Sequence, residues 1–257
     1  MWTVVNQELI EIQDLQGLPR KLNSKISLYP IKMKDALDFY ECVPVLNLNK
    51  NDTDNIEILR MSYLKFLILM FTQFQELKHL EDKLMKLLRL ILRTEDIKLR
   101  VKDNGKYFIL VDDEFEISEF DFKKLKTIVS EQNMIGLDDE NINPEFKKKL
   151  KEAEEFMAKR AKKPASLKQR ILSYQYEMKL SLETIFELSL YQFNSGLETI
   201  NHIKNADNIQ QALYSGMVTF KDETKLPNWL SAIEKGDNPL VMDAEQLKKD
   251  MNNTFKK

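Results

Sequence analysis

The stretch that decides the fold is Ile56–Arg93, IEILRMSYLKFLILMFTQFQELKHLEDKLMKLLRLILR, which contains neither glycine nor proline. Apolar residues recur in it at every seventh position, with others at most companion positions, as in an amphipathic helix. They are Tyr63, Met70, Leu77, Leu84 and Ile91, accompanied by Leu67, Phe74 and Leu88. One continuous helix would span roughly 57 Å at about 1.5 Å per residue. Two antiparallel helices with a break near Thr72–Glu76 are an equal alternative. Either arrangement needs a partner surface for this stripe.

The composition predicts a soluble globular protein in which helices dominate. The chain has 257 residues, 43% of them apolar, and a net charge of −2, enough to bury one large core or two smaller ones. It contains six glycines, well below average usage. This scarcity argues against a β-sandwich, a Rossmann fold or a glycine-rich phosphate loop. We therefore expect a mainly α fold with a small α+β insert.

The sequence also predicts an intracellular protein without membrane contact. Cys42 is the single cysteine, so no intramolecular disulfide can form, and the N-terminus lacks the pattern of a signal peptide. The longest apolar run, Leu64–Phe71, is far shorter than the ~20 residues of a membrane span. We expect no membrane partner.

Residues 1–95 are predicted to form an N-terminal segment packed on the central helix or helix pair. Trp2–Ile12 alternates loosely and predicts one or two short strands, or an arm that docks elsewhere. Ile26–Ile31 is predicted to be extended, and Met33–Val43 has helical spacing up to Pro44, which should end that helix.

Residues 96–144 are predicted to form the α+β insert, a β-hairpin around 97–112 followed by a helix. Ile97–Asp112 contains two alternating runs on either side of Asn104-Gly105, the pair typical of a two-residue type I′ turn. Phe115 and Ile117 predict a third strand. Ser118-Glu119-Phe120-Asp121 resembles a capping box and predicts a helix through Asn133.

The rest of the chain is predicted as a charged linker helix (145–165), a helical module (166–230) and a flexible tail (231–257). Ser166–Gln169 and Ser189–Gln192 fit the capping box, and Ser181 precedes a shorter helix. Asp207 is predicted to cap a separate helix, Ile209–Tyr214. Together these starts predict four helices within 166–216.

No residue pattern predicts catalysis, a metal site or a cofactor. His79 and His202 are isolated on predicted helices, and Cys42 has no basic neighbour in the sequence. We therefore expect a protein that is not an enzyme and that needs no cofactor.

One alternative concerns carboxylates at the exit of the hairpin. They are Asp112, Asp113, Glu114, Glu116, Glu119 and Asp121, with Lys123 two residues after the last. A two-metal nuclease uses carboxylates and a lysine in this way. The alternation with Phe115, Ile117 and Phe120 explains the same charges as the solvated face of a strand.

Two stretches carry a resemblance to a known family. They are residues 120–156, FDFKKLKTIVSEQNMIGLDDENINPEFKKKLKEAEEF, and residues 181–230, SLETIFELSLYQFNSGLETINHIKNADNIQQALYSGMVTFKDETKLPNWL. In the order of their elements they resemble proteins encoded in tail-morphogenesis regions of phages of low-GC Gram-positive bacteria. The likeness covers residues 97–230 and leaves the first 95 outside. It implies a tail-assembly chaperone, a non-catalytic protein that holds the long helical tape-measure protein until the tail tube forms around it.

The resemblance implies a protein partner, the host cytoplasm or the virion as location, and no catalytic residue. Eleven methionines and an aromatic exit segment with Phe220 and Trp229 could supply adaptable grooves for partner helices, although methionines also fill ordinary cores. Two alternatives stay open: a structural tail or baseplate component, and a nucleic-acid-associated protein that uses the basic stretch Lys147–Lys163. The net charge of −2 weighs against the latter. The oligomeric state is open.

Overall fold

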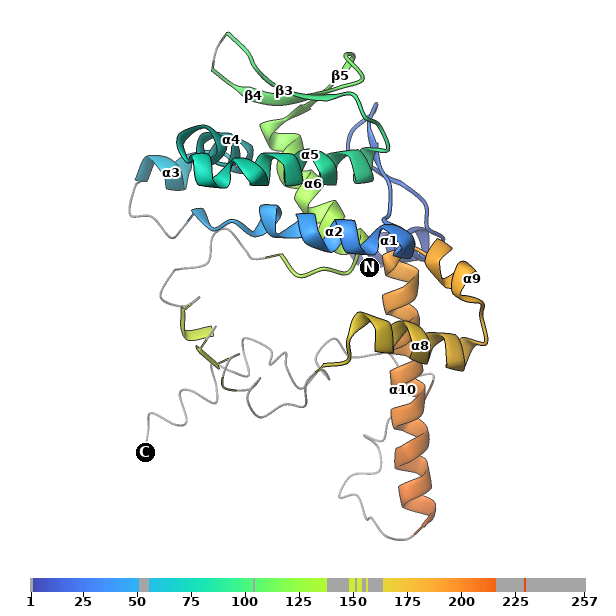
Figure 1. The fold of residues 1–257 in the computed structure, drawn as a ribbon. Coiled ribbons are helices and arrows are strands. Elements are labelled where there is room, and N and C mark those ends of the chain that lie inside the picture. Colours follow the sequence, from blue (N-terminus) through green and yellow to red (C-terminus); the bar gives the residue numbers. More distant parts are fainter. Residues whose placement is uncertain are drawn as a thin grey trace. The chain divides into compact units, whose positions relative to one another are not determined.

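The computed structural model describes residues 2–50, 56–103, 105–137, 148–150, 152–153, 156, 164–215 and 229. It is mainly helical, with a two-stranded and a three-stranded antiparallel sheet in the described residues, which confirms the predicted fold class (Figure 1). The α-helices are α1 (Trp2–Leu15), α2 (Ala36–Cys42), α3 (Ile56–Arg60), α4 (Tyr63–Gln73), α5 (Lys78–Leu92), α6 (Glu119–Gln132), α8 (Leu167–Met178), α9 (Leu182–Glu187) and α10 (Leu190–Tyr214). The strands are β1 (Arg20–Lys21), β2 (Ser27–Leu28), β3 (Ile97–Val101), β4 (Tyr107–Val111) and β5 (Phe115–Ser118), and the 3₁₀ turns are η1 (Met33–Asp35), η2 (Val43–Asn47) and η4 (Gln75–Leu77).

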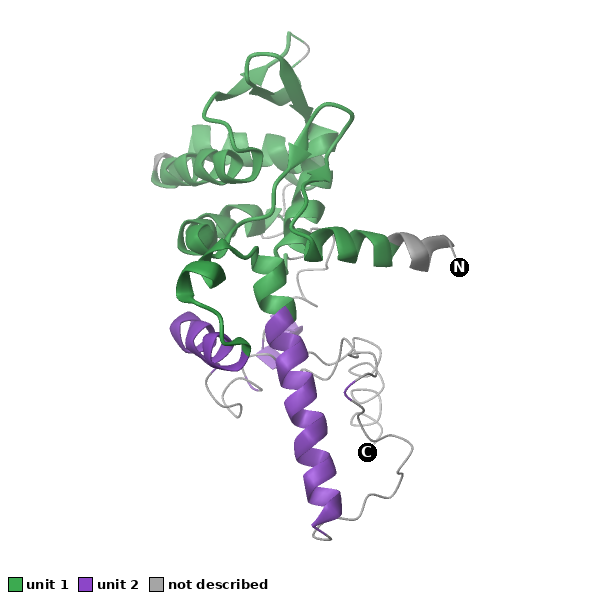
Figure 2. Cartoon of the chain, turned by 90° about the vertical axis from the view of Figure 1, so that its right-hand side faces the viewer, with its two compact units in different colours: residues 1–144, 178–195 green, residues 145–177, 196–257 purple. Residues whose placement is uncertain are grey.

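The chain divides into two compact units (Figure 2). Unit 1 contains residues 1–144 and 178–195, and unit 2 contains residues 145–177 and 196–257. This division follows spatial contacts and differs from the division along the sequence given above, because residues 178–195 pack with the N-terminal part of the chain.

The central stretch is broken, as the two-helix alternative predicted. Phe74 has extended backbone angles and ends α4, and η4 leads into α5. A second break lies at Met61–Ser62, where the Ser62 hydroxyl accepts a hydrogen bond from the Lys65 N–H at 3.3 Å and caps α4. A serine preceding an apolar run is a helix start in its own right, so the absence of glycine and proline did not guarantee continuity.

The predicted apolar stripe builds the core of unit 1. Leu84, Leu88 and Ile91 of α5 are fully buried, and α5 packs against α2, whose Phe39 and Cys42 are also fully buried. The stripe on α4 packs against α5 and α6. Phe74, at the break, is half exposed.

The prediction of one or two short strands for Trp2–Ile12 was wrong, because this segment lies in helix α1. The alternative, an arm that docks elsewhere, stays a prediction. The helix ends in a Schellman motif: the Leu18 N–H donates to the Gln13 carbonyl at 3.1 Å and the Gly17 N–H donates to the Asp14 carbonyl at 2.9 Å. Gly17 has a φ of +70°, which glycine adopts without strain. The overlooked signal was therefore the C-terminal glycine of a helix, which outweighed a weak alternation.

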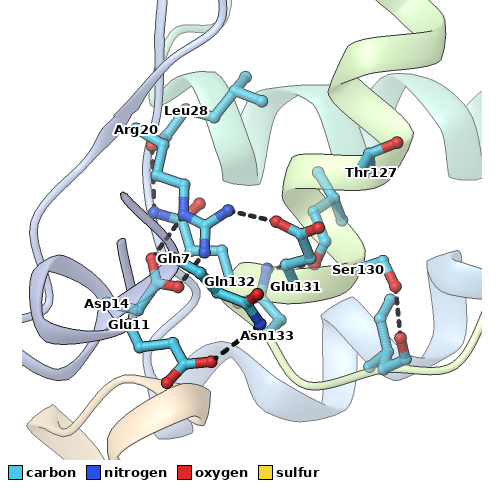
Figure 3. A network of polar contacts seen from close by, with 12 residues as sticks. Gln7, Glu11, Asp14, Arg20, Leu28, Thr127, Ser130, Glu131, Gln132 and Asn133 are labelled. Carbon is cyan, nitrogen blue, oxygen red and sulfur yellow. Dashed lines mark hydrogen bonds and ion pairs between the residues drawn. The ribbon is translucent and has the colours of Figure 1, made fainter. Parts of the chain in front are cut away.

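A buried polar network fixes α1 to the rest of unit 1 (Figure 3). The Arg20 guanidinium on β1 donates to both carboxylate oxygens of Asp14, with its Nε 2.7 Å from Oδ1, and its Nη1 lies 2.6 Å from Glu131 Oε2 on α6. Next to it, Asn133 Oδ1 accepts from the Ile31 N–H at 2.9 Å. Asp14 is 0% exposed. The network thus joins α1 and β1, which are neighbours in the sequence, to α6, more than a hundred residues further along the chain.

The three strands β3, β4 and β5 form an antiparallel sheet in that order, which confirms the hairpin and the third strand. The hairpin loop is longer than the predicted two residues. The Lys102 N–H donates to the Lys106 carbonyl at 2.9 Å, and this hydrogen bond encloses three residues. Gly105 has a φ of +76°, whereas Asn104 lies outside the described residues. The sheet lies beside α4, α5 and α6 (Figure 1).

The capping predictions were confirmed. Ser118 accepts from the Asp121 N–H at 3.1 Å, and Ser181 accepts from the Thr184 N–H at 3.1 Å. Both serine–glutamine boxes form: Ser166 with Gln169, and Ser189 with Gln192. In each case local sequence alone specified a helix start.

The separate helix predicted for Ile209–Tyr214 was wrong, because α10 runs without a break from Leu190 to Tyr214. Asp207 lies inside it rather than at a cap. Aspartate favours caps only by a small free energy, and no glycine or proline stands nearby to end the preceding turn. The described part of 166–216 therefore contains three helices.

Within unit 2, α10 passes close to Tyr174 of α8 at Gly196. A Cβ added at Gly196 would lie 2.7 Å from Cε2 and from the hydroxyl oxygen of Tyr174. Tyr174 is buried, and burial raises the pKa of its hydroxyl. The glycine therefore allows a close approach that a larger residue would prevent.

We expect Gly196→Ala to destabilise this contact. Overpacking costs about 1–3 kcal/mol, and the better helix propensity of alanine recovers at most about 1 kcal/mol. Urea unfolding followed by circular dichroism measures the difference. In a Tyr174→Ala background the same replacement should be stabilising; an equal loss in both backgrounds would contradict the role of the tyrosine ring.

Candidate functional site

A pocket of about 600 Å³ opens in unit 1 where the hairpin loop, the start of α4 and the start of α6 come together. We call it the lysine pocket. It is lined by Lys50, Ser62, Tyr63, Lys102, Lys106, Tyr107, Phe108, Ser118, Glu119, Phe120 and Lys123. Its volume lies within the range of about 300–1,000 Å³ that is usual for small-molecule sites.

Four lysines give the pocket a local excess of positive charge. Lys102 and Lys106 flank the hairpin loop, Lys123 lies on the first turns of α6, and Lys50 follows η2. Glu119 is the single carboxylate in the lining. No local sequence pattern connects these lysines, because they come from three separate segments.

Two helix N-termini open on the same pocket, because its lining includes the capping residues of α4 and α6, Ser62 and Ser118. The N-terminus of a helix carries a partial positive charge and favours anions. The first turn of α4 contains no acidic residue. The first turn of α6 contains Glu119 and Asp121, which offset its dipole.

The carboxylates nearest the pocket are already engaged within the fold. Glu119 Oε1 accepts a hydrogen bond from the Tyr107 N–H at 3.0 Å, and Asp121 closes the capping box with Ser118. Glu116 binds the Lys102 ammonium at 2.5 Å. The same ammonium lies 5.1 Å from the ring centroid of Phe108.

Aromatic rings complete the lining. Tyr107 and Phe108 are half-buried on β4, whereas Phe120, in the first turn of α6, is 80% exposed. Burial of a phenylalanine side chain would stabilise the fold by about 1.5–3 kcal/mol, so this ring at the pocket is not used for packing.

A second surface feature is an apolar row on α1. Leu9, Ile12 and Leu15 are exposed, and at about 100° per residue they share roughly one third of the helix circumference. Asp14, which anchors the helix through Arg20, points from the opposite side. Figure 2 shows α1 leaving the other helices of unit 1.

Of the two predicted partner-binding residues, the structure describes one. Trp229 is 56% exposed. Phe220 lies outside the described residues, as does the predicted tail, 231–257.

The isolated histidines and the cysteine take no part in the pocket. His79 is exposed on α5, with its Nδ1 2.7 Å from the Glu76 carbonyl oxygen, and His202 is half-buried on α10. Cys42 lies in the core, and burial raises the pKa of its thiol. This is the packing role expected of a small buried residue.

The hairpin carboxylates are distributed over separate partners rather than gathered around one point. Asp113 binds Lys98 Nζ at 2.7 Å, and this hydrogen bond lowers the pKa of its carboxyl. Asp112 accepts from the Thr94 hydroxyl. Within the part of the chain that the structure describes, no three His, Cys, Asp or Glu side chains are grouped as metal ligands would be.

Only a few residues of the basic stretch Lys147–Lys163 are described. Residues 148–150, 152–153 and 156 are helical, and Lys148 and Lys149 are exposed. None of the helices in the described ranges is both long and apolar enough to cross a membrane.

Residues 159–234 match the family model described as the YomV second domain, a phage-associated domain family. The match covers α8, α9, α10 and Trp229. No curated protein and no solved structure matches the chain.

Proposed function

We propose that this chain is a non-catalytic phage protein that binds a helical protein of the tail during assembly, as a chaperone. Two observations support the proposal: the similarity of residues 159–234 to a phage-associated domain family, and the apolar row on α1. The row is the observation that carries it, because it offers a binding surface.

The apolar row suits a helical partner. A helix that docks on another protein presents apolar residues three or four positions apart, and Leu9, Ile12 and Leu15 have this spacing. Exposed apolar residues in a contiguous group mark interaction sites in soluble proteins. The opposite side of α1 is held by the buried Asp14–Arg20 pair, so the row is presented on a fixed element.

We expect the double variant Leu9→Glu/Leu15→Glu to lose partner capture while the fold is retained. The tagged protein would be expressed with the proteins of its neighbouring genes, and the co-purifying material identified by mass spectrometry. A long helical tape-measure-like protein should be captured by the original chain and not by the variant. Both leucines are more than half exposed, so the midpoint of thermal unfolding should stay within the small range of surface substitutions.

Trp229, which lies within the matched residues 159–234, offers a second variant that is independent of α1. Trp229→Ala should weaken capture more than it lowers thermal stability, since the side chain is 56% exposed. A large loss of thermal stability with capture intact would assign Trp229 to packing. Capture by both variants at the original level would overturn the proposed binding surface.

The alternative function, a structural tail or baseplate component, predicts a different outcome. The chain would then remain in purified phage particles and bind tube or baseplate proteins in fixed stoichiometry. A chaperone would be present in the lysate and absent from the particles.

A further inference from the structure

We propose that the lysine pocket binds a nucleotide, with the phosphate held by its lysines and the base stacked on Phe120. This inference does not depend on the proposed function. It concerns a site that lies outside the matched residues 159–234 and outside the apolar row on α1.

The charge of the pocket selects an anion. The pocket is lined by four lysines and by a single carboxylate, Glu119, which already accepts the Tyr107 N–H. Lys102 is paired with Glu116, and the Lys50 ammonium donates to the Met61 carbonyl, a neutral acceptor, at 3.0 Å. The N-terminus of α4 adds a partial positive charge with no acidic residue in its first turn. Phosphate groups are anions that both lysines and helix N-termini bind in proteins. The overall charge of −2 does not oppose this, because the field in a pocket is set by the groups that line it.

The aromatic lining selects a flat group beside that anion. Phe120 follows Glu119 at the start of α6, lines the pocket and is 80% exposed. Base–aromatic stacking is the main sequence-independent contact of proteins with single-stranded nucleic acid, and it is combined with basic groups that follow the phosphates. A cluster of lysines around exposed aromatic rings has this composition.

The volume of the pocket limits the ligand to an unpaired nucleotide. About 600 Å³ accommodates a small molecule, and a base inside a duplex cannot reach an aromatic ring without leaving its stack. The same chemistry is offered by a free mononucleotide and by one nucleotide of a single strand. The two sources are distinguished by experiment.

The test is a fluorescence-anisotropy titration of the full chain with a short labelled oligothymidylate, with thymidine monophosphate, inorganic phosphate and a duplex as competitors. We expect the single strand to bind, with an affinity that falls as salt rises. Phe120→Ala should weaken binding about fivefold to a hundredfold, the range found when stacking aromatic residues are replaced by alanine. The double variant Lys106→Ala/Lys123→Ala should reduce the slope of log affinity against log salt by about 1.4, at about 0.7 for each single-strand phosphate contact.

Matched controls separate the pocket from the rest of the surface. Tyr176→Ala removes an equally exposed aromatic ring on α8 (81%), and Lys148→Ala/Lys149→Ala removes two exposed lysines of the basic stretch. Both controls should leave the affinity and the salt slope unchanged. Competition by the mononucleotide as strong as that by the unlabelled strand would identify a free nucleotide as the ligand, and weaker competition a strand.

Several outcomes would overturn the proposal. Absence of binding to strand and mononucleotide would do so. A loss of binding in the Lys148/Lys149 control equal to that in the pocket variant would place the contact in the basic stretch instead. Equal competition by inorganic phosphate, together with no effect of Phe120→Ala, would reduce the site to an anion site without a base.

Discussion

Replacement of Arg20 by alanine should lower the free energy of unfolding by about 3–5 kcal/mol, because it leaves a buried carboxylate without its counter-charge. Asp14 is 0% exposed, and its two carboxylate oxygens both accept from the Arg20 guanidinium. Glu131, the second partner, is exposed and can be solvated when the arginine is lost. Urea unfolding of the purified chain, extrapolated to water, measures the change.

The double variant Asp14→Ala/Arg20→Ala provides the control. Because it removes the pair together, its loss of stability should be smaller than the sum of the two single losses, with an interaction energy of about 0.5–3 kcal/mol. Strictly additive losses would show that the pair contributes nothing beyond packing. The Arg20→Ala chain should also expose the link of α1 to protease, since this network joins α1 to α6.

Replacement of Phe122 by alanine should cost about 3–5 kcal/mol, the usual loss for a fully buried phenylalanine. Its ring is fully buried on α6 and stacks on Tyr63 of α4, with the ring centroids 6.4 Å apart. The Lys126 ammonium lies 3.4 Å from the centroid of the same tyrosine ring. The variant therefore removes the centre of the contact between α4 and α6, and a large downward shift of the thermal midpoint should report it.

The neighbouring phenylalanine on the same helix gives a matched comparison. Phe120→Ala removes the same side chain two positions earlier, but this ring is 80% exposed and should cost no more than about 0.5 kcal/mol. Comparable losses in both variants would contradict the assignment of Phe120 to ligand binding rather than to packing. The comparison thus tests the fold and prepares the binding experiment.

Little of the lysine pocket could be predicted from the sequence. Lys50, Lys102 and Lys123 come from three segments, and charges of this kind look like ordinary solvated faces until the fold places them around one space. The carboxylates at the hairpin exit were visible as a cluster in the sequence, yet the turn after β4 and the cap of α6 give them different partners. Short-range sequence patterns therefore did not predict the lysine pocket, and the carboxylates that cluster in the sequence do not cluster in the fold.

The apolar row on α1 was hidden for a related reason. The sequence contains Leu9, Ile12 and Leu15, but the loose alternation of Val4, Leu9 and Ile12 led to a prediction of short strands or a docking arm rather than a helix. Gly17, the C-terminal glycine of the Schellman motif, was the one local sign of a helix. Once the segment is helical, the anchoring of Asp14 decides which side of it stays exposed.

The sequence by itself determined the elements whose cause is local. The serine capping boxes at Ser118, Ser166 and Ser189, the hairpin on either side of Gly105 and the apolar stripe of α5 all follow from residues within one or two turns of each other. Hydrogen bonds of this kind form between residues close together in the chain. The spacing of residue types along the sequence therefore predicts them.

Only the tertiary structure decided the long-range arrangements: the link from the buried Asp14–Arg20 pair to Glu131 of α6, the continuity of α10 beside Tyr174, and the convergence of four lysines on one pocket. Each depends on contacts between different segments of the chain. The free energies of such contacts exceed the differences in intrinsic helix propensity between ordinary residues, which are about a few tenths of a kcal/mol. The physical reason is that propensity acts within a segment, whereas burial and charge pairing act between segments and decide among the conformations that propensity leaves open.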